Sequence, residues 1–234
     1  MDQATSGFLK KLRIPIGFVC LLWIIHIFQA ISGIEFIRLG VFPRHVEGLP
    51  GILFTPLIHG SWEHLFSNSV SFLMLSVVFF SFYPRIALKS LFWLYLLSGL
   101  GIWIFAQPNS YHIGASGVVY GMVSLVFWSG LFRRNVKSII LALIIMIVYA
   151  GLFEGIFPGK EGISWEGHLF GGIAGIFLAW LYRKDVETDE IPEPRIEEEE
   201  EEKRYFLPRD AFEMTMAQRR AIYEQGAGGR EQGG

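Results

Sequence analysis

The 234-residue chain is too hydrophobic for an ordinary soluble domain, because 52% of its residues are apolar, 15% are aromatic and the mean hydropathy is +0.40. Its net charge of −2 conceals an uneven distribution: residues 1–184 carry 13 Lys and Arg against 7 Asp and Glu, whereas residues 185–234 carry 7 against 15. We therefore expect a basic membrane domain (1–184) followed by an acidic tail (185–234), and the pattern gives no indication of nucleic-acid binding.

Six stretches of the chain are long and apolar enough to be membrane-spanning helices, each of which needs about 20 residues. They lie near 14–32, 66–83, 89–106, 115–132, 137–156 and 166–182. The first lacks a small-residue cleavage site, so we interpret it as a retained helix rather than a signal peptide. Because backbone groups in lipid must be satisfied within the segment, the sequence predicts an all-α polytopic bundle of six helices in the bilayer.

The short connections between these stretches indicate their orientation. Those on one side contain 10 Lys and Arg residues and those on the other side contain 3. By the positive-inside rule, both termini are then cytoplasmic, and the second, fourth and sixth spans begin at the outer face. The compact chain suggests a prokaryotic inner membrane.

Two segments outside the spans have distinct compositions. The first loop, residues 32–63, mixes prolines with apolar side chains, and we expect it to lie in the membrane interface with short helices of its own. In the tail, the acidic run Glu197–Glu202 cannot form a core, which predicts a disordered linker. Residues 209–224 match a short amphipathic helix, either a docking element or residual helical propensity.

Four polar side chains occur near the outer ends of the inward-running spans, where an unsatisfied polar group would be costly. They are His64 and Asn68 in the second span, Ser116 in the fourth and His168 in the sixth. Since all three helices enter from the same side, we expect these side chains to lie at similar depth. The topology thus predicts that they converge.

Ser116 lies in the segment Gly114-Ala115-Ser116-Gly117, within the first turn of the fourth span. Free amide groups in a first helical turn, together with the helix dipole, favour a developing oxyanion. The serine is therefore a candidate nucleophile that helps to form its own oxyanion hole. Small residues with serine also form ordinary helix-packing surfaces in membranes, so this motif alone leaves both interpretations open.

His168 begins a glycine-rich helical face that includes Gly171 and Gly175. Glycines at this spacing allow a neighbouring helix to approach closely, and the imidazole projects from the outer end of the same face. A histidine at a helix end is often only a satisfied interfacial residue. Together with Ser116 at the same depth, however, it indicates a nucleophile and its general base.

The remaining polar residues have more than one interpretation. His64 and Asn68 are four residues apart on one helical face and can donate hydrogen bonds to an oxyanion, or can serve as a cap or interhelical contact. His59 suits a structural role in the loop, and Tyr120 can pack under the imidazole of His168 or simply fill the core. A three-histidine metal site made by His59, His64 and His168 is a weaker alternative, because no typical zinc motif is present.

The sequence resembles the rhomboid family of intramembrane serine proteases through three motifs in the same order. They are His59-x4-His64-x3-Asn68, Gly114-Ala115-Ser116-Gly117 followed by Tyr120, and Gly167-His168 leading into the glycine repeat. The resemblance covers residues from about 14 to 182 and omits the tail. Each motif is weak alone, but their combination with six spans is highly specific.

The resemblance implies a six-helix fold with a Ser116–His168 dyad, and an oxyanion hole formed by His64, Asn68 and the Ser116 amide. It also implies that Tyr120 stacks on His168 and that the fourth and sixth spans touch at Gly171 and Gly175. It implies no metal and no cofactor, and substrates that are single-span membrane proteins cut near the outer end of the helix. A catalytically silent, client-escorting protein is the alternative.

One departure from the family pattern lies in the first loop. Many members carry a Trp-Arg pair there, whereas this chain has Phe42-Pro43-Arg44-His45. The family's way of anchoring this loop is therefore not carried over to this chain. Neither the oligomeric state nor the identity of a substrate follows from the sequence.

Overall fold

The computed structural model describes residues 3–134, 136–159, 164–185, 187 and 214–228, and these residues are predominantly helical. The elements are α1 (Gln3–Ser32), η1 (Ile37–Leu39), η2 (Val46–Gly48), α2 (Gly51–Phe54), η3 (Thr55–Leu57), α3 (Trp62–Phe82), α4 (Ala87–Phe105), α5 (Ser116–Arg133), α6 (Val136–Val148), η4 (Ala150–Ile156), α7 (Trp165–Leu181) and α8 (Met216–Gly228). Within the described residues, the β structure consists of an isolated bridge between Val41 and His112. The all-α fold predicted from the sequence is confirmed.

The chain divides into two compact units, residues 1–191 and 192–234. The second contains α8, which overlaps the segment 209–224 where the sequence predicts a short helix. The acidic run Glu197–Glu202, predicted to be a disordered linker, lies outside the described residues. All further description concerns the first unit.

Each predicted span coincides with a helical segment of the described residues. Among the described residues, α1, α3, α4 and α5 are each long and apolar enough to cross a membrane, and α6 with η4 adds a fifth crossing if this bent pair is one span. The fifth predicted span is not straight, because α6 and η4 are bent by 67° at their junction. The sixth, α7, has 17 residues and is about 26 Å long, which is at the lower end of the range for a membrane-spanning helix.

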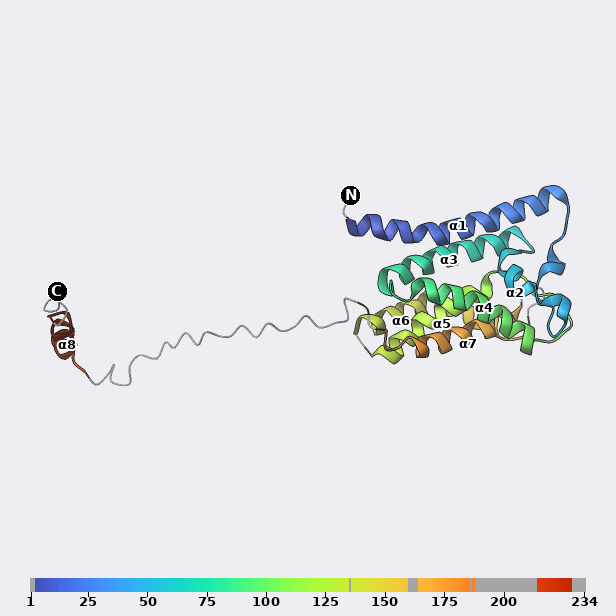
Figure 1. Ribbon diagram of the computed structural model, residues 1–234. Coiled ribbons are helices and arrows are strands. Elements are labelled where there is room, and N and C mark those ends of the chain that lie inside the picture. Colours follow the sequence, from blue (N-terminus) through green and yellow to red (C-terminus); the bar gives the residue numbers. More distant parts are fainter. Residues whose placement is uncertain (1–2, 135, 160–163, 186, 188–213, 229–234) are drawn as a thin grey trace. The chain divides into compact units, whose positions relative to one another are not determined.

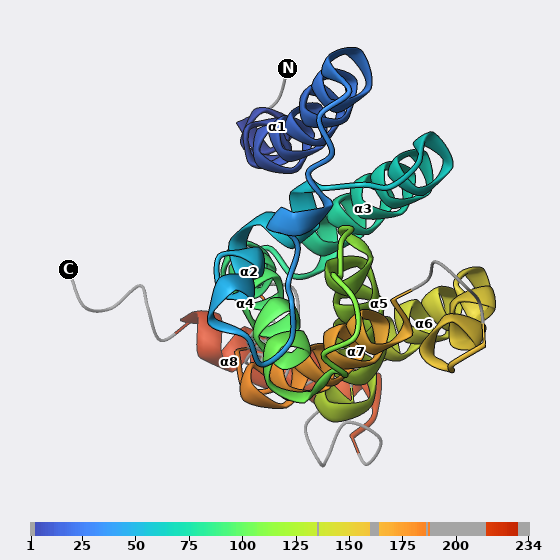
Figure 2. The ribbon, with the colours of Figure 1, turned by 90° about the vertical axis from the view of Figure 1, so that its right-hand side faces the viewer.

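Helix α5 occupies the centre of the first unit. Figure 1 shows the helices running side by side, and Figure 2 shows α5 among α3, α4, α6 and α7. Contacts between these elements agree with this view, since α5 packs against all four, while α1 packs against α3. The helix that begins with Ser116 is thus the one most enclosed by protein.

Apolar side chains fill the interior and also cover much of the outer surface. Leu75, Phe79, Leu94, Met122 and Leu178 are fully buried in one continuous core. Large apolar side chains are exposed on the outer faces of the helices, for example Ile24, Phe92, Ile147 and Phe177. Exposed apolar surface of this extent suits contact with lipid tails. The chain is an integral membrane protein.

Helices α5 and α7 are in backbone contact along their glycines. A Cβ atom at Gly171 would lie 2.0 Å from the carbonyl oxygen of Gly117, and one at Gly175 would lie 2.3 Å from that of Gly121. The Ser124 hydroxyl donates a hydrogen bond of 2.7 Å to the carbonyl of Gly172. In lipid, where no hydrophobic force drives helices together, such close packing and interhelical hydrogen bonds hold them. The structure therefore brings these spans together as the resemblance implies.

The first outer loop is anchored to the end of α4 without a Trp-Arg pair. The Arg44 guanidinium donates to the carbonyl of Ala106 at 3.3 Å, and the indole of Trp103 donates to the carbonyl of His45 at 2.9 Å. Val41 packs with Ile102 and Ala106 in a small buried cluster. As expected, the loop contains short helices, namely η1, η2, α2 and η3.

Candidate active site

Ser116 is the first residue of α5, as the sequence predicts, and its position depends on a glycine just before it. Gly114 has a φ of +107°, a backbone conformation that glycine adopts at little cost. A Cβ there would lie 2.5 Å from Cε1 of His64. Gly114 thus allows the turn into α5 and also lets the His64 ring approach the backbone beside the serine.

His168 lies in the first turns of α7, whose start is capped by a serine. The Ser164 hydroxyl accepts a hydrogen bond of 3.3 Å from the amide of Gly167, which satisfies a donor that the helix leaves free. The imidazole is only 7% exposed. Its Nδ1 lies 2.9 Å from the carbonyl oxygen of Gly155, and a carbonyl can only accept. Nδ1 therefore carries the proton, and Nε2 is the nitrogen that can act as a base.

Tyr120 stacks on the imidazole of His168. The ring centroids are 4.0 Å apart and the planes differ by 8°. The phenol hydroxyl donates a hydrogen bond of 2.8 Å to the carbonyl of Leu152 in η4. One face of the base is thus held by a ring that is itself fixed at its far end.

The carbonyl that orients His168 comes from the broken end of the fifth predicted span. Gly155 belongs to η4, and a Cβ at this position would lie 2.0 Å from the Tyr120 hydroxyl oxygen and 3.0 Å from Nδ1 of His168. Only glycine therefore fits between these rings without rearrangement. The bend between α6 and η4 gives the site a backbone acceptor where many serine hydrolases have a carboxylate.

His64 and Asn68 lie near the N-terminal end of α3, which is capped by Ser61 in the same way that Ser164 caps α7. The Ser61 hydroxyl accepts from the His64 amide at 3.1 Å. The Asn68 side-chain amide donates to the carbonyl of His64 at 3.0 Å. Because a carboxamide has two N–H donors, this bond holds Asn68 in place and leaves the second donor for another acceptor.

These side chains line one cavity of about 950 Å³. Its wall contains Ser116, His168, His64, Asn68 and Tyr120, together with polar groups of α3 and of the loop before α5. Three helices thus present a hydroxyl, two imidazoles and a carboxamide to one space. Within the described part of the chain, no three His, Cys, Asp or Glu side chains are grouped so that they could hold a metal ion.

His59 lies outside this cavity wall and is almost completely buried, with 1% of its surface exposed. Its Nε2 accepts a long hydrogen bond of 3.4 Å from the amide of Ala115. Burial lowers the pKa of His59 to about 3, and the neighbouring His64 contributes in the same direction. A neutral His59 therefore supports the backbone immediately before Ser116 at neutral pH.

Three residues at the site belong to none of the motifs found in the sequence. Gly155 acts through its backbone, which no side-chain motif reveals. His112 and Glu166 are both buried and face each other across the base of the loop before α5. Glu166 lies two positions before His168, within the first turn of α7. A carboxylate so close to the histidine motif is the sequence feature that could have identified Glu166 as a site residue.

Comparison with known proteins identifies the family to which this helical membrane protein belongs. The Rhomboid domain family model matches residues 47–185, which contain α3, α5 and α7, the helices that carry His64, Asn68, Ser116 and His168. The chain belongs to the rhomboid family. It is 34% identical over 176 residues to the uncharacterized protein Rv1337 of Mycobacterium tuberculosis, covering 70% of this chain and 72% of that one.

Two further relatives come from other organisms. Rhomboid-like protein 11, chloroplastic, of Arabidopsis thaliana is 29% identical, covering 54% of this chain and 50% of its own. A Bacillus subtilis protein named "Putative rhomboid protease YdcA" is 27% identical, and the match covers 55% of this chain and 65% of that one. The family supports a protease-like activity within the membrane.

Proposed function

We propose that the protein is an intramembrane serine endopeptidase in which Ser116 is the nucleophile and His168 the general base. The observation that carries this proposal is the hydrogen bond between His168 Nδ1 and the Gly155 carbonyl, on a ring that shares its cavity with Ser116. This bond leaves Nε2 free to take a proton. A histidine with a structural role alone would not need one nitrogen unoccupied beside a buried serine.

The reaction follows the usual order of serine hydrolysis. His168 Nε2 takes the proton of the Ser116 hydroxyl while Oγ attacks the substrate carbonyl, and the imidazolium then protonates the leaving amine. The acyl-enzyme is hydrolysed by water that His168 activates in turn. The Gly155 carbonyl and the Tyr120 ring keep the imidazole in one tautomer and one orientation through both steps.

The oxyanion is stabilised by donors from two helices. The amide of Ser116 belongs to the first turn of α5, where amide groups have no intrahelical acceptor. His64 and the second N–H of Asn68 approach from α3. Donors fixed in advance and shielded from bulk water are worth more than the same donors in water.

The substrates are single-span membrane proteins cut near the outer end of their helix. A hydrogen-bonded helix hides its carbonyls, so a segment must unwind before Ser116 can attack it. A cavity with a polar wall inside a lipid-exposed bundle supplies polar groups to an unwound backbone and admits water. We place the protein in a prokaryotic inner membrane with both termini in the cytoplasm, as the charge distribution predicts.

The decisive experiment compares wild-type protein with Ser116→Ala and His168→Ala in liposomes that contain a model single-span substrate. We expect cleavage by the wild type only. A fluorophosphonate probe should label the wild type and neither variant. Cleavage retained by Ser116→Ala would refute the nucleophile, and a wild-type protein that neither cleaves nor reacts with the probe would favour client binding without catalysis.

The orientation is tested separately. A reporter that is active only in the cytoplasm, fused after residue 184, should be active, and the same reporter placed in the loop between α4 and α5 should be inactive. The opposite result would overturn the orientation and leave the dyad unaffected.

A further inference from the structure

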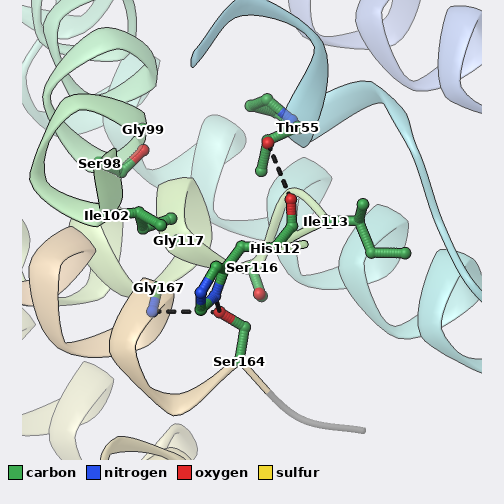
Figure 3. A pocket seen from close by; sticks show the side chains of 12 residues that line it. Thr55, Ser98, Gly99, Ile102, His112, Ile113, Ser116, Gly117, Ser164 and Gly167 are labelled. Carbon is green, nitrogen blue, oxygen red and sulfur yellow. Dashed lines mark hydrogen bonds between the residues drawn. The ribbon is translucent and has the colours of Figure 1, made fainter. Parts of the chain in front are cut away.

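Close to the dyad, three segments that are distant in sequence meet at the buried side chain of His112 (Figure 3). They are the loop before α5, the start of α7 and the first outer loop. A small pocket beside Ser116 is lined by Thr55, His112, Ser164 and Gly167, among others. His112 therefore lies four residues before the proposed nucleophile and next to the helix that carries the proposed base.

The hydrogen bonds at this junction define the state of the His112 ring. Its Nδ1 lies 2.6 Å from the Ser164 hydroxyl oxygen, and that oxygen already accepts from the Gly167 amide. The hydroxyl proton is therefore available for donation to Nδ1, which leaves the ring proton on Nε2. Nε2 faces the Glu166 carboxylate at 3.6 Å. Burial lowers the pKa of His112, against the opposing effect of Glu166, so the ring is neutral at neutral pH.

Glu166 connects α7 to the same loop at a second point. Its other carboxylate oxygen accepts a hydrogen bond of 2.8 Å from the amide of Gln107. The loop between α4 and α5 is thus held to α7 at its beginning, by Gln107, and near its end, by His112. Both tethers end on residues within the first turn of α7 or its cap.

The backbone of His112 extends the junction to the first outer loop. Its amide donates to the carbonyl of Val41 at 2.8 Å, and its carbonyl accepts from Val41 at 3.1 Å and from the Thr55 hydroxyl at 2.9 Å. Figure 3 shows the Thr55 and Ser164 bonds converging on His112 from opposite sides. One residue therefore fixes the loop before Ser116 against both of its neighbours.

We propose that His112 and Glu166 are positioning residues that hold the start of α5 to the start of α7 and thereby set the Ser116–His168 geometry. This inference rests on the proposed function. The glycine contact fixes the two helices along their length, and the His112–Glu166 junction fixes their outer ends, where the reacting groups are. Burying a carboxylate costs free energy that an apolar pair would not require, so its role must lie in position rather than in stability.

The chain supplies a closely matched control for Glu166. The segment Ser61-Trp62-Glu63 starts α3 as Ser164-Trp165-Glu166 starts α7, with a capping serine and a glutamate at the second helical position. Glu63 lines the large cavity and is exposed rather than packed against His112. A Glu-to-Gln change at 63 therefore repeats the loss of charge at the same helical position without touching the junction.

The test measures substrate cleavage in liposomes by Glu166→Gln, His112→Phe, the double variant and Glu47→Gln, a change at an exposed glutamate outside the wall of the large cavity. We expect kcat to fall on the order of 10-fold to 100-fold in both single variants at the junction, with KM within about twofold, because misplaced reacting groups lower the rate more than substrate binding. The double variant should be no slower than the slower single variant, since both changes break one junction. Glu47→Gln should match the wild type in cleavage, and Glu63→Gln serves as the control for hydrogen exchange alone, because Glu63 lines the cavity.

A second measurement does not depend on catalysis. Hydrogen–deuterium exchange of residues 107–115 should speed up in Glu166→Gln and stay unchanged in Glu63→Gln, with each variant also made in a Ser116→Ala background. If His112→Phe does not fold, Glu166→Gln carries both readouts, since it is nearly isosteric. Wild-type kcat in Glu166→Gln, or effects that simply add in the double variant, would overturn the positioning role. Cleavage by Ser116→Ala would instead refute the proposed function.

Discussion

The contact between α5 and α7 leads to a sharp prediction at Gly171. A Cβ at this position would lie 2.0 Å from the Gly117 carbonyl oxygen, 2.7 Å from its carbonyl carbon and 3.0 Å from its Cα. All three are backbone atoms, so no side-chain rotation can relieve the clash. Real Cβ contacts are essentially never below 3.0 Å, and Gly171→Ala must therefore move α7 away from α5 by about 1 Å.

That displacement acts directly on the proposed dyad. Gly117 follows Ser116, and Gly171 is one helical turn after His168. A misplacement of about 1 Å between reacting groups can cost on the order of 10²-fold in rate, and overpacking of this kind typically destabilises by about 1–3 kcal/mol. We expect Gly171→Ala to fold, to unfold at a lower temperature, and to lose about two orders of magnitude in kcat.

The adjacent glycine is the matched control. A Cβ at Gly172 has no atom within 4 Å. Gly172→Ala should therefore leave kcat unchanged and stabilise the helix by up to about 1 kcal/mol. Gly175→Ala meets Gly121 two turns below His168 and should destabilise similarly with a smaller effect on kcat.

The assay is cleavage in liposomes, read beside thermal unfolding of the same preparations. If Gly171→Ala cleaves within about threefold of Gly172→Ala, then the helix contact does not set the geometry of the site, and the reasoning is wrong. The same conclusion would follow if Gly171→Ala lost stability but kept the wild-type kcat.

The other predictions concern the walls of the cavity and its support. Tyr120→Phe keeps the ring stacked on His168 and should retain kcat within about threefold, whereas Tyr120→Leu removes the ring and should lower kcat on the order of 10-fold in the same cleavage assay. Asn68→Ala removes one oxyanion donor and should lower kcat about 10²–10³-fold, and an unchanged kcat would exclude that role. Because the pKa of His59 falls from 6.5 to about 3 on folding, the unfolded state binds more protons between these values, and stability should drop as the pH falls below 6.5. Between pH 7 and pH 5 the contribution of His59 to this loss is about 2 kcal/mol at most, and the loss measured by thermal unfolding should be smaller by that amount in His59→Gln, while the part due to His112 remains.

Much of this fold is legible in the sequence because lipid imposes a simple rule. Apolar stretches of about 20 residues, separated by charged connections, predict the helical segments. Polar residues near the ends of these stretches predict the residues of the cavity wall. The sequence identifies Ser116 and His168 as candidates because a polar group in an apolar helix is energetically costly and therefore indicates a function. The glycine spacing after His168 likewise predicted the contact that Gly171 makes.

The parts that escaped prediction are those that a side-chain pattern does not encode. The 67° bend between α6 and η4 places a backbone carbonyl, that of Gly155, against His168, and an apolar run looks the same whether it is straight or broken. The sequence does not identify the partners of His112, because the bridge to Val41 and the contact with Glu166 both require the loop to fold back on two distant segments.

A small sequence difference separates the two cavity histidines to which we assign different roles. Both α3 and α7 begin with a capping serine followed by Trp and Glu, so their first turns are built alike. His64 is the third helical residue of α3, whereas Gly167 takes that place in α7 and His168 comes one residue later, about 100° further around the helix. A Cβ at Gly167 would lie 2.9 Å from the Ser164 hydroxyl oxygen, and a Cβ at Gly117 would lie 3.1 Å from the Gly167 carbonyl oxygen, so α5 and α7 approach closely at this point. The later histidine contacts Tyr120 and Gly155, which orient the proposed base, while the earlier one packs on Gly114, where our proposal requires a donor to the oxyanion.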